Sequence, residues 1–91
     1  MALVVVTLRV MPKSAESDLK KIEEEAEKLI KEFGGEPGKT EIKPIAFGLK
    51  ALEIFFVMPE EKGSTEDLEK KIAALDDVNS AEVVDVRRAV G

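Results

Sequence analysis

Lys50-Ala-Leu-Glu-Ile-Phe-Phe-Val-Met58 is the segment of this 91-residue chain that says most about its architecture. Successive side chains of an extended strand point to opposite faces, so the segment has two faces, and both carry apolar groups. One face holds Leu52, Ile54, Phe56 and Met58, and the other holds Ala51, Glu53, Phe55 and Val57. This pattern predicts a central strand with helices over one face, while the other face is partly apolar and open.

A second strand is predicted just before the central one, over residues 40–45. Pro44 has no backbone N–H to give to a neighbouring strand, which favours a place at the edge of a sheet. Residues 36–39, with the sequence Glu-Pro-Gly-Lys, have the composition of a turn. Phe47-Gly48 marks a tight reversal, so the edge strand and the central strand are expected to lie side by side.

Both ends of the chain also have the character of strands. Residues 2–11 are rich in β-branched side chains, and Pro12 then ends the pairing. The face of this strand expected in the core consists of Val4, Val6, Leu8 and Val10. Residues 80–89 predict a last strand, in which Val84 and Val86 alternate with Val83, Asp85 and Arg87.

Residues 14–33 are predicted to form an amphipathic helix, because apolar residues recur at helical spacing among glutamates and lysines. The apolar stripe consists of Leu19, Ile22, Ala26, Leu29, Ile30 and Phe33. Ser14 can cap the start of the helix, with Ser17 as a later alternative. Gly34-Gly35 supply the left-handed conformation that ends a helix.

A second helix is predicted after Pro59, which stops the central strand, and after a polar loop at residues 60–63. Ser64 with Asp67 three residues later resembles a capping box that opens this helix. Its single apolar stripe consists of Leu68, Ile72 and Leu75.

The predicted order of elements is therefore βαββαβ. Two helices of unequal length on one face of a four-stranded antiparallel sheet make an α+β, ferredoxin-like sandwich, whose halves obey the right-handed crossover rule. Length and composition fit one domain over residues 1–91. Because this fold serves many functions, the function has to be argued from a site.

Composition narrows the classes of function. The chain has no cysteine and no histidine, so it lacks thiolate nucleophiles, the usual general base and the commonest metal ligand. We therefore expect a binding protein and not an enzyme, with no cofactor and no metal. A net charge of −5 repels a phosphate backbone, so no direct contact with nucleic acid is expected. With no apolar run that spans a bilayer and no signal-peptide pattern, we expect a cytoplasmic protein without a membrane partner.

Two segments are not explained by the fold alone. Residues 44–50 place an aromatic ring, Phe47, at a reversal instead of inside an element, although the ring could fold back onto the core. Arg87 and Arg88 are the only adjacent arginines of an acidic chain, where they could simply balance neighbouring acids. From the residues alone, a structural and a functional interpretation both stay open.

These two segments resemble the guanine-nucleotide exchange domain of translation elongation factor one beta, in its short archaeal form. The similarity is carried by Pro44-Ile-Ala-Phe-Gly-Leu-Lys-Ala-Leu-Glu-Ile54 and by Val78-Asn-Ser-Ala-Glu-Val-Val-Asp-Val-Arg-Arg88. It extends over nearly the whole chain, including residues 17–24 and 63–72. The fold of that family is also the ferredoxin-like sandwich.

The resemblance implies both a partner and an activity. The partner is elongation factor one alpha, the GTPase that delivers aminoacyl-tRNA, in its GDP-bound and nucleotide-free forms. The activity is faster release of GDP, so that GTP can replace it. Exchange breaks no covalent bond, which agrees with a chain that lacks the usual catalytic side chains.

The resemblance also implies site residues. In the family, the aromatic residue of the turn enters a pocket on the second domain of the GTPase, and Phe47 holds the matching position beside Gly48. Lys50 is expected to support this turn. A lysine near the family's C terminus reaches the magnesium and phosphate region, and Arg88 stands at that place, with Arg87 beside it as a helper. A guanidinium is larger and more weakly hydrated than an ammonium, so this position departs from the lysine pattern.

Two other functions compete with nucleotide exchange. The partly apolar open face formed by Val5, Phe55 and Val57 fits a regulatory or ligand-binding domain that dimerises through its sheet. An RNA-binding module is the weaker alternative. It needs stacking aromatics on the central strands, where only Phe55 is available.

Overall fold

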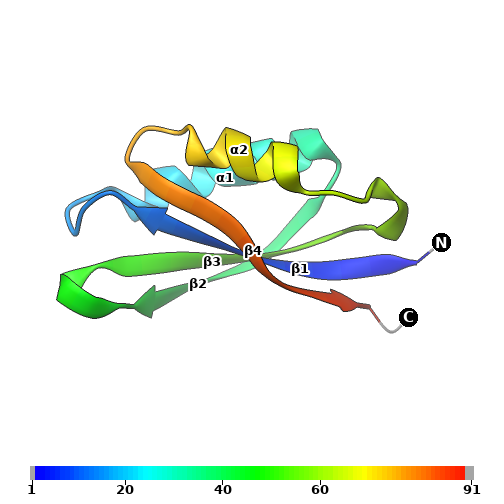
Figure 1. Ribbon diagram of the computed structural model, residues 1–91, viewed down its shortest axis with the longest axis horizontal. Coiled ribbons are helices and arrows are strands. Elements are labelled where there is room, and N and C mark those ends of the chain that lie inside the picture. The colour runs from blue at the N-terminus through cyan, green and yellow to red at the C-terminus, as the bar shows by residue number, and fades with distance from the viewer. Residues whose placement is uncertain (1, 90–91) are drawn as a thin grey trace.

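A computed structural model describes residues 2–89 of the chain (Figure 1). Its elements are β1 (Leu3–Pro12), α1 (Leu19–Phe33), β2 (Glu36–Pro44), β3 (Lys50–Pro59), α2 (Glu66–Ala73) and β4 (Val78–Arg88). The strands form one antiparallel sheet in the order β2-β3-β1-β4, and both helices cover the same face of it (Figure 1). The predicted ferredoxin-like βαββαβ sandwich is confirmed. Among the residues described, no helix is long and apolar enough to cross a membrane.

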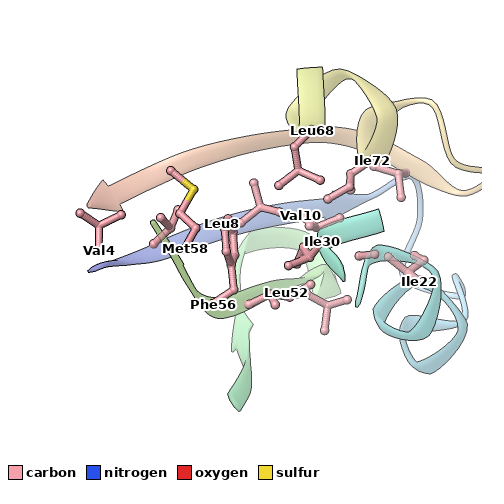
Figure 2. Close-up of a cluster of buried hydrophobic side chains, with 14 residues drawn as sticks. Val4, Leu8, Val10, Ile22, Ile30, Leu52, Phe56, Met58, Leu68 and Ile72 are labelled. Atoms are coloured by element: carbon pink, nitrogen blue, oxygen red, sulfur yellow. The ribbon is translucent and has the colours of Figure 1, made fainter. Parts of the chain in front are cut away.

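The core lies between the helices and the sheet, where the labelled side chains of both layers point toward one another (Figure 2). All the alternating positions of β1 and β3 that were predicted to face the core are buried. The helices contribute Ile22, Ala26, Ile30, Leu68 and Ile72. Burial of one such large side chain stabilises a fold by about 1.5 to 3 kcal/mol. The alternation of the strands and the spacing of the helices therefore fix the two layers.

β2 is longer than the strand predicted over residues 40–45. It spans Glu36–Pro44, so the prediction of a turn at residues 36–39 is wrong. The register with β3 shifts between Pro37 and Thr40, which forms an irregularity at the free edge of the sheet. An edge strand tolerates proline and a bulge because one side of its backbone needs no partner.

α1 begins later than the predicted residue 14, and its cap is neither serine. The carboxylate of Asp18 accepts a hydrogen bond from the backbone N–H of Lys21 at 3.2 Å. Both serines instead belong to a separate turn before the helix. The Ser17 hydroxyl accepts from the backbone N–H of Ser14 at 3.2 Å, and the Ser14 hydroxyl accepts from the backbone N–H of Glu16 at 3.2 Å. At the other end Gly34 has φ 105°, which confirms the predicted left-handed stop.

The capping box predicted for Ser64 and Asp67 does not form. Ser64 lies one residue before the cap position, and its hydroxyl accepts from the backbone N–H of Glu66 at 3.1 Å. Glu69 does more to fix the helix, because its carboxylate accepts from the backbone N–H of Val83 at 2.9 Å. This bond ties α2 to β4.

β4 does not keep the simple alternation predicted for it. Val84 has no partner in β1, because Val83 and Asp85 on either side pair with successive residues of that strand. Val83 therefore packs against the core, while Val84 and Val86 are half exposed. The extra residue is a β-bulge, and a bulge reverses the facing of everything on one side of it.

Candidate functional site

The turn between β2 and β3 presents Phe47 to solvent. The side chain is 97% exposed, so the interpretation that its ring folds back onto the core is wrong. The turn itself is well closed. Ile45 donates its N–H to the carbonyl of Leu49 at 2.7 Å, and Leu49 donates to the carbonyl of Ala46 at 3.3 Å. The exposed ring is thus carried on an ordered turn and not on a loose loop.

Phe47 also adopts a backbone conformation that is uncommon for a residue with a side chain. Its φ is 62° and its ψ is 32°, and Gly48 follows with φ 75°. Two successive residues with positive φ are the mark of a type I′ turn, whose first central position is usually Asn or Asp. The left-handed conformation costs a bulky residue about 1 to 2 kcal/mol. Exposure of the ring and strain of the backbone both act against stability, so the fold itself gives no reason for a phenylalanine at this position.

Gly48 and Lys50 complete the turn. A Cβ on Gly48 would lie 4.0 Å from the Cβ of Ala15, so there is room for a side chain and the positive φ alone calls for glycine. Lys50 is the exposed first residue of β3 and pairs with Pro44. Within residues 2–89 Lys50 forms no ion pair, so its positive charge is not neutralised there, three residues after Phe47 in the chain.

The open face of the sheet is hollowed beside this turn. The depression has a volume of about 530 Å³, and Pro44 and Ile45 at the end of β2 form part of its wall. Ala51 also lines it and is only 1% exposed, although it faces away from the helices. Arg9 and Glu53 also line the depression and form an ion pair of 2.9 Å. The depression therefore adjoins the turn that carries Phe47.

The rest of the open face offers little free apolar surface. Val5, Phe55 and Val57 are all partly buried within the sheet. The ammonium of Lys39 lies 5.0 Å from the centre of the Phe55 ring, so a cation already occupies one side of that ring. This arrangement does not favour stacking of an RNA base on Phe55.

Arg88 lies at the other end of the sheet. It pairs with Val4, a core residue, so its side chain leaves β4 on the helix side. Ala89 donates its N–H to the carbonyl of Leu3 at 2.9 Å, which holds the end of β4 against β1. The guanidinium donates two hydrogen bonds to the carboxylate of Glu60, from Nε at 2.7 Å and from Nη2 at 2.9 Å. This contact lowers the pKa of Glu60 and raises the pKa of Arg88, so each group favours the charged form of the other.

Arg87 points the opposite way. It pairs with Val5 on the open face, and its Nε donates to the carboxylate of Asp85 at 3.0 Å. Successive residues of a strand alternate between faces, so the two arginines do not converge. The structure therefore does not bring Arg87 to the place where it was expected to help Arg88.

The aromatic turn and Arg88 stand at opposite ends of the molecule. β3 begins just after the turn and ends just before Glu60, and its 10 residues cover about 30 Å at about 3.3 Å per residue. The longest dimension of the molecule is 41 Å. In Figure 1 the β2–β3 turn and the end of β4 lie at the two ends of the long axis, both away from the helices. A partner that touches both must reach across about 30 Å of surface.

Glu60 was not singled out by sequence reasoning. It was assigned to a polar loop, and it lies 28 positions from Arg88 in the chain. The two residues meet because β1 runs between β3 and β4 and brings their ends to the same place. The sequence around either residue therefore does not predict this contact.

A ferredoxin-like sandwich that displays a strained, solvent-exposed phenyl ring on a rigid turn has the features of a protein-binding domain. Comparison with known families makes this more specific. The chain belongs to the EF-1 guanine nucleotide exchange domain family, whose model matches residues 5–89.

Proteins named elongation factor 1-beta match this chain over nearly its whole length. The one from Staphylothermus marinus is 43% identical over 89 residues, which cover 97% of this chain and 98% of the relative. The one from Sulfolobus acidocaldarius is 43% identical over 86 residues, covering 93% and 94%. The one from Methanothermobacter thermautotrophicus is 41% identical over 85 residues, again 93% and 94%.

These matches confirm the family resemblance that the sequence indicated at the turn and at the last strand. The chain is a guanine-nucleotide exchange factor for elongation factor one alpha in translation elongation. The roles of its individual residues follow from the geometry and are proposed below.

Proposed function

We propose that this exchange factor contacts elongation factor one alpha at both ends of its sheet. Phe47 is the anchor, supported by Gly48 and Lys50, and Arg88 is the group that acts on the bound nucleotide. The observation that carries the proposal is the state of Phe47, which is 97% exposed and held in a left-handed conformation. A fold gains nothing from such a residue unless something else binds it.

The anchor is organised before the partner arrives. The two hydrogen bonds that close the turn fix the backbone on both sides of Phe47. Binding therefore has little chain entropy to remove at this point, which raises affinity without any added contact. Transfer of a phenyl ring from water into an apolar pocket contributes about 1.5 to 3 kcal/mol. Lys50 adds a positive charge beside the pocket.

Arg88 supplies a permanent positive charge at the far end. Its side chain is 74% exposed, and a guanidinium stays protonated at any physiological pH. Placed near the phosphates, this cation competes with Mg²⁺ for the same anionic groups. A thousand-fold faster release needs about 4 kcal/mol of barrier lowering.

One interface of ordinary size can include both ends. A standard interface covers about 800 Å² of each partner, and a round patch of that area is about 32 Å across. The two ends of β3 are about 30 Å apart, which matches this diameter. On this proposal the aromatic pocket and the nucleotide site lie in different parts of the GTPase, and one contact surface about 30 Å across reaches both.

The same partner is bound in two states, with GDP and without nucleotide. Linkage requires that the factor by which the exchange domain weakens nucleotide binding equals the factor by which nucleotide weakens binding of the domain. No covalent bond changes, so the activity needs no cofactor and no nucleic acid. We place the activity in the cytoplasm, where translation takes place, and assign it to a single domain.

Release of a fluorescent GDP from elongation factor one alpha tests the proposal. Catalytic amounts of the purified chain should accelerate release. Phe47→Ala should raise the concentration of exchange factor needed, whereas Arg88→Ala should slow release from the complex already formed. A wild-type rate of release with the Arg88 variant would contradict the proposed role of its charge. Wild-type affinity of the Phe47 variant for the GTPase would contradict its proposed role as the anchor.

A further inference from the structure

Glu60 fixes the place of Arg88 in the free protein. It follows the last residue of β3, donates its N–H to the carbonyl of Ala2 at 3.0 Å, and accepts from the N–H of Gly63 at 3.2 Å. Its backbone is therefore held to the sheet on one side and closed in a short turn on the other. Both oxygens of its carboxylate accept hydrogen bonds from the guanidinium, at 2.7 Å and 2.9 Å. A fork of this kind fixes the plane as well as the position of the arginine.

Glu60 is also the group on which the position of the guanidinium depends. Among residues 2–89, Arg88 forms no other side-chain hydrogen bond and no other ion pair. Asp85 is engaged with Arg87 on the opposite face of the sheet. Glu61 belongs to the same turn as Glu60 and is exposed, yet in the described part of the chain it forms no ion pair.

We propose that Glu60 is a positioning residue that competes with the nucleotide site of the partner for Arg88. This inference rests on the role proposed above for Arg88. To reach the phosphate and magnesium region, the guanidinium must leave the carboxylate, because a carboxylate carried along would repel the phosphates. Glu60 thus holds the arginine at the surface until a stronger cluster of anionic groups takes its place.

The strength of the contact suits a reversible hold. Both side chains are open to solvent, with 74% of Arg88 and 43% of Glu60 exposed. Exposed ion pairs shift equilibria by at most about fivefold, and salt weakens them further. Glu60 can therefore retain the guanidinium in the free protein without preventing its transfer. Loss of this competition should make exchange faster.

Glu60→Gln tests the inference, because it keeps the shape of the side chain and removes its charge. In the GDP-release assay at about 0.05 M salt, we expect release from the complex to be about two- to fivefold faster than with the wild type. At about 0.5 M salt the difference should disappear. Glu61→Gln is the matched control, since it changes the net charge of −5 by the same amount on the same turn. It should leave release unchanged.

The double variant Glu60→Gln with Arg88→Ala separates this inference from the proposed function. If Glu60 acts through Arg88, the double variant should release GDP as slowly as Arg88→Ala alone. A slow Arg88→Ala combined with an unchanged or slower Glu60→Gln would overturn the competition and leave the role of Arg88 intact. A wild-type rate for Arg88→Ala would overturn the proposed function itself, and the inference with it.

Discussion

Phe47 and Arg88 stand at opposite ends of one sheet, separated by the whole length of β3, which is about 30 Å. They share no contact: the turn is closed by its own backbone, and the arginine is held by Glu60. The proposed anchor and the group proposed to act on the nucleotide therefore lie in two regions that the sheet keeps apart. The sheet itself acts as the spacer between them.

This separation predicts that the two functions can be lost independently. Changes more than about 10 Å apart without shared partners usually add in free energy. Phe47→Ala should weaken association by about 10- to 100-fold, the loss expected for one buried ring. In the variant that also carries Arg88→Ala, the two losses in exchange efficiency should multiply. A double variant no worse than the poorer single variant would show that both residues act in one step, contrary to the geometry.

The opposite facing of the two arginines gives a second prediction. Arg87→Ala and Arg88→Ala remove the same charge from neighbouring positions, so general electrostatic attraction changes equally. Only Arg88 lies on the helix side beside Glu60, whereas Arg87 is paired with Asp85 on the open face. We therefore expect Arg88→Ala to slow GDP release at least tenfold and Arg87→Ala to change it less than twofold. Equal losses would mean that net charge matters and position does not.

Sequence reasoning succeeded where a single segment carries its own signal. The alternation at Leu52, Ile54 and Phe56 predicted the central strand, and Gly34 predicted the end of α1. Sequence reasoning failed where the structure depends on a contact with a segment that is distant in the chain, or on how two strands pair. The bulge at Val84 depends on the register with β1, which the residues of β4 alone do not encode.

The candidate site divides in the same way. The reversal at Phe47 was predicted from the sequence, because Phe47-Gly48 marks a tight turn between two strands. Whether the ring lies on the core or in solvent was left open, since that depends on what the hairpin packs against. The hold of Glu60 on Arg88 was missed, because β1 must first bring the ends of two other strands together.

A third prediction concerns the titration of Glu60. The hydrogen bond from Arg88 lowers the pKa of Glu60, while a free glutamate titrates near pH 4.3. The contact therefore contributes to stability above about pH 4.3, and this contribution is lost as the pH falls through the lower pKa of the folded state. In an NMR titration of the side-chain carboxyl carbons, Arg88→Ala should move the midpoint of Glu60 upward.

Glu41 provides the internal control for that titration. Its pKa is lowered by hydrogen bonds and charge from Lys39, and also by Lys43, at a site that does not involve Arg88. Its midpoint should stay low in the Arg88→Ala variant. If both glutamates moved together, the cause would be a general change of charge and not the loss of one ion pair.

Because the backbone at Phe47 is strained, we expect one substitution there to raise the stability of the fold and to weaken binding to the GTPase. Asn is favoured at the first central position of a type I′ turn and tolerates positive φ, so Phe47→Asn should relieve the backbone at no cost to the core. We expect the free energy of unfolding in urea to rise by about 1 kcal/mol, while association with the GTPase weakens by about 10- to 100-fold. Phe47→Leu keeps both a bulky apolar side chain and the strained backbone, so it should retain part of the affinity without the gain in stability. An asparagine variant that is no more stable than the wild type would show that Phe47 does not strain the turn. An asparagine variant that binds as tightly as the wild type would show that the phenyl ring does not bind the GTPase.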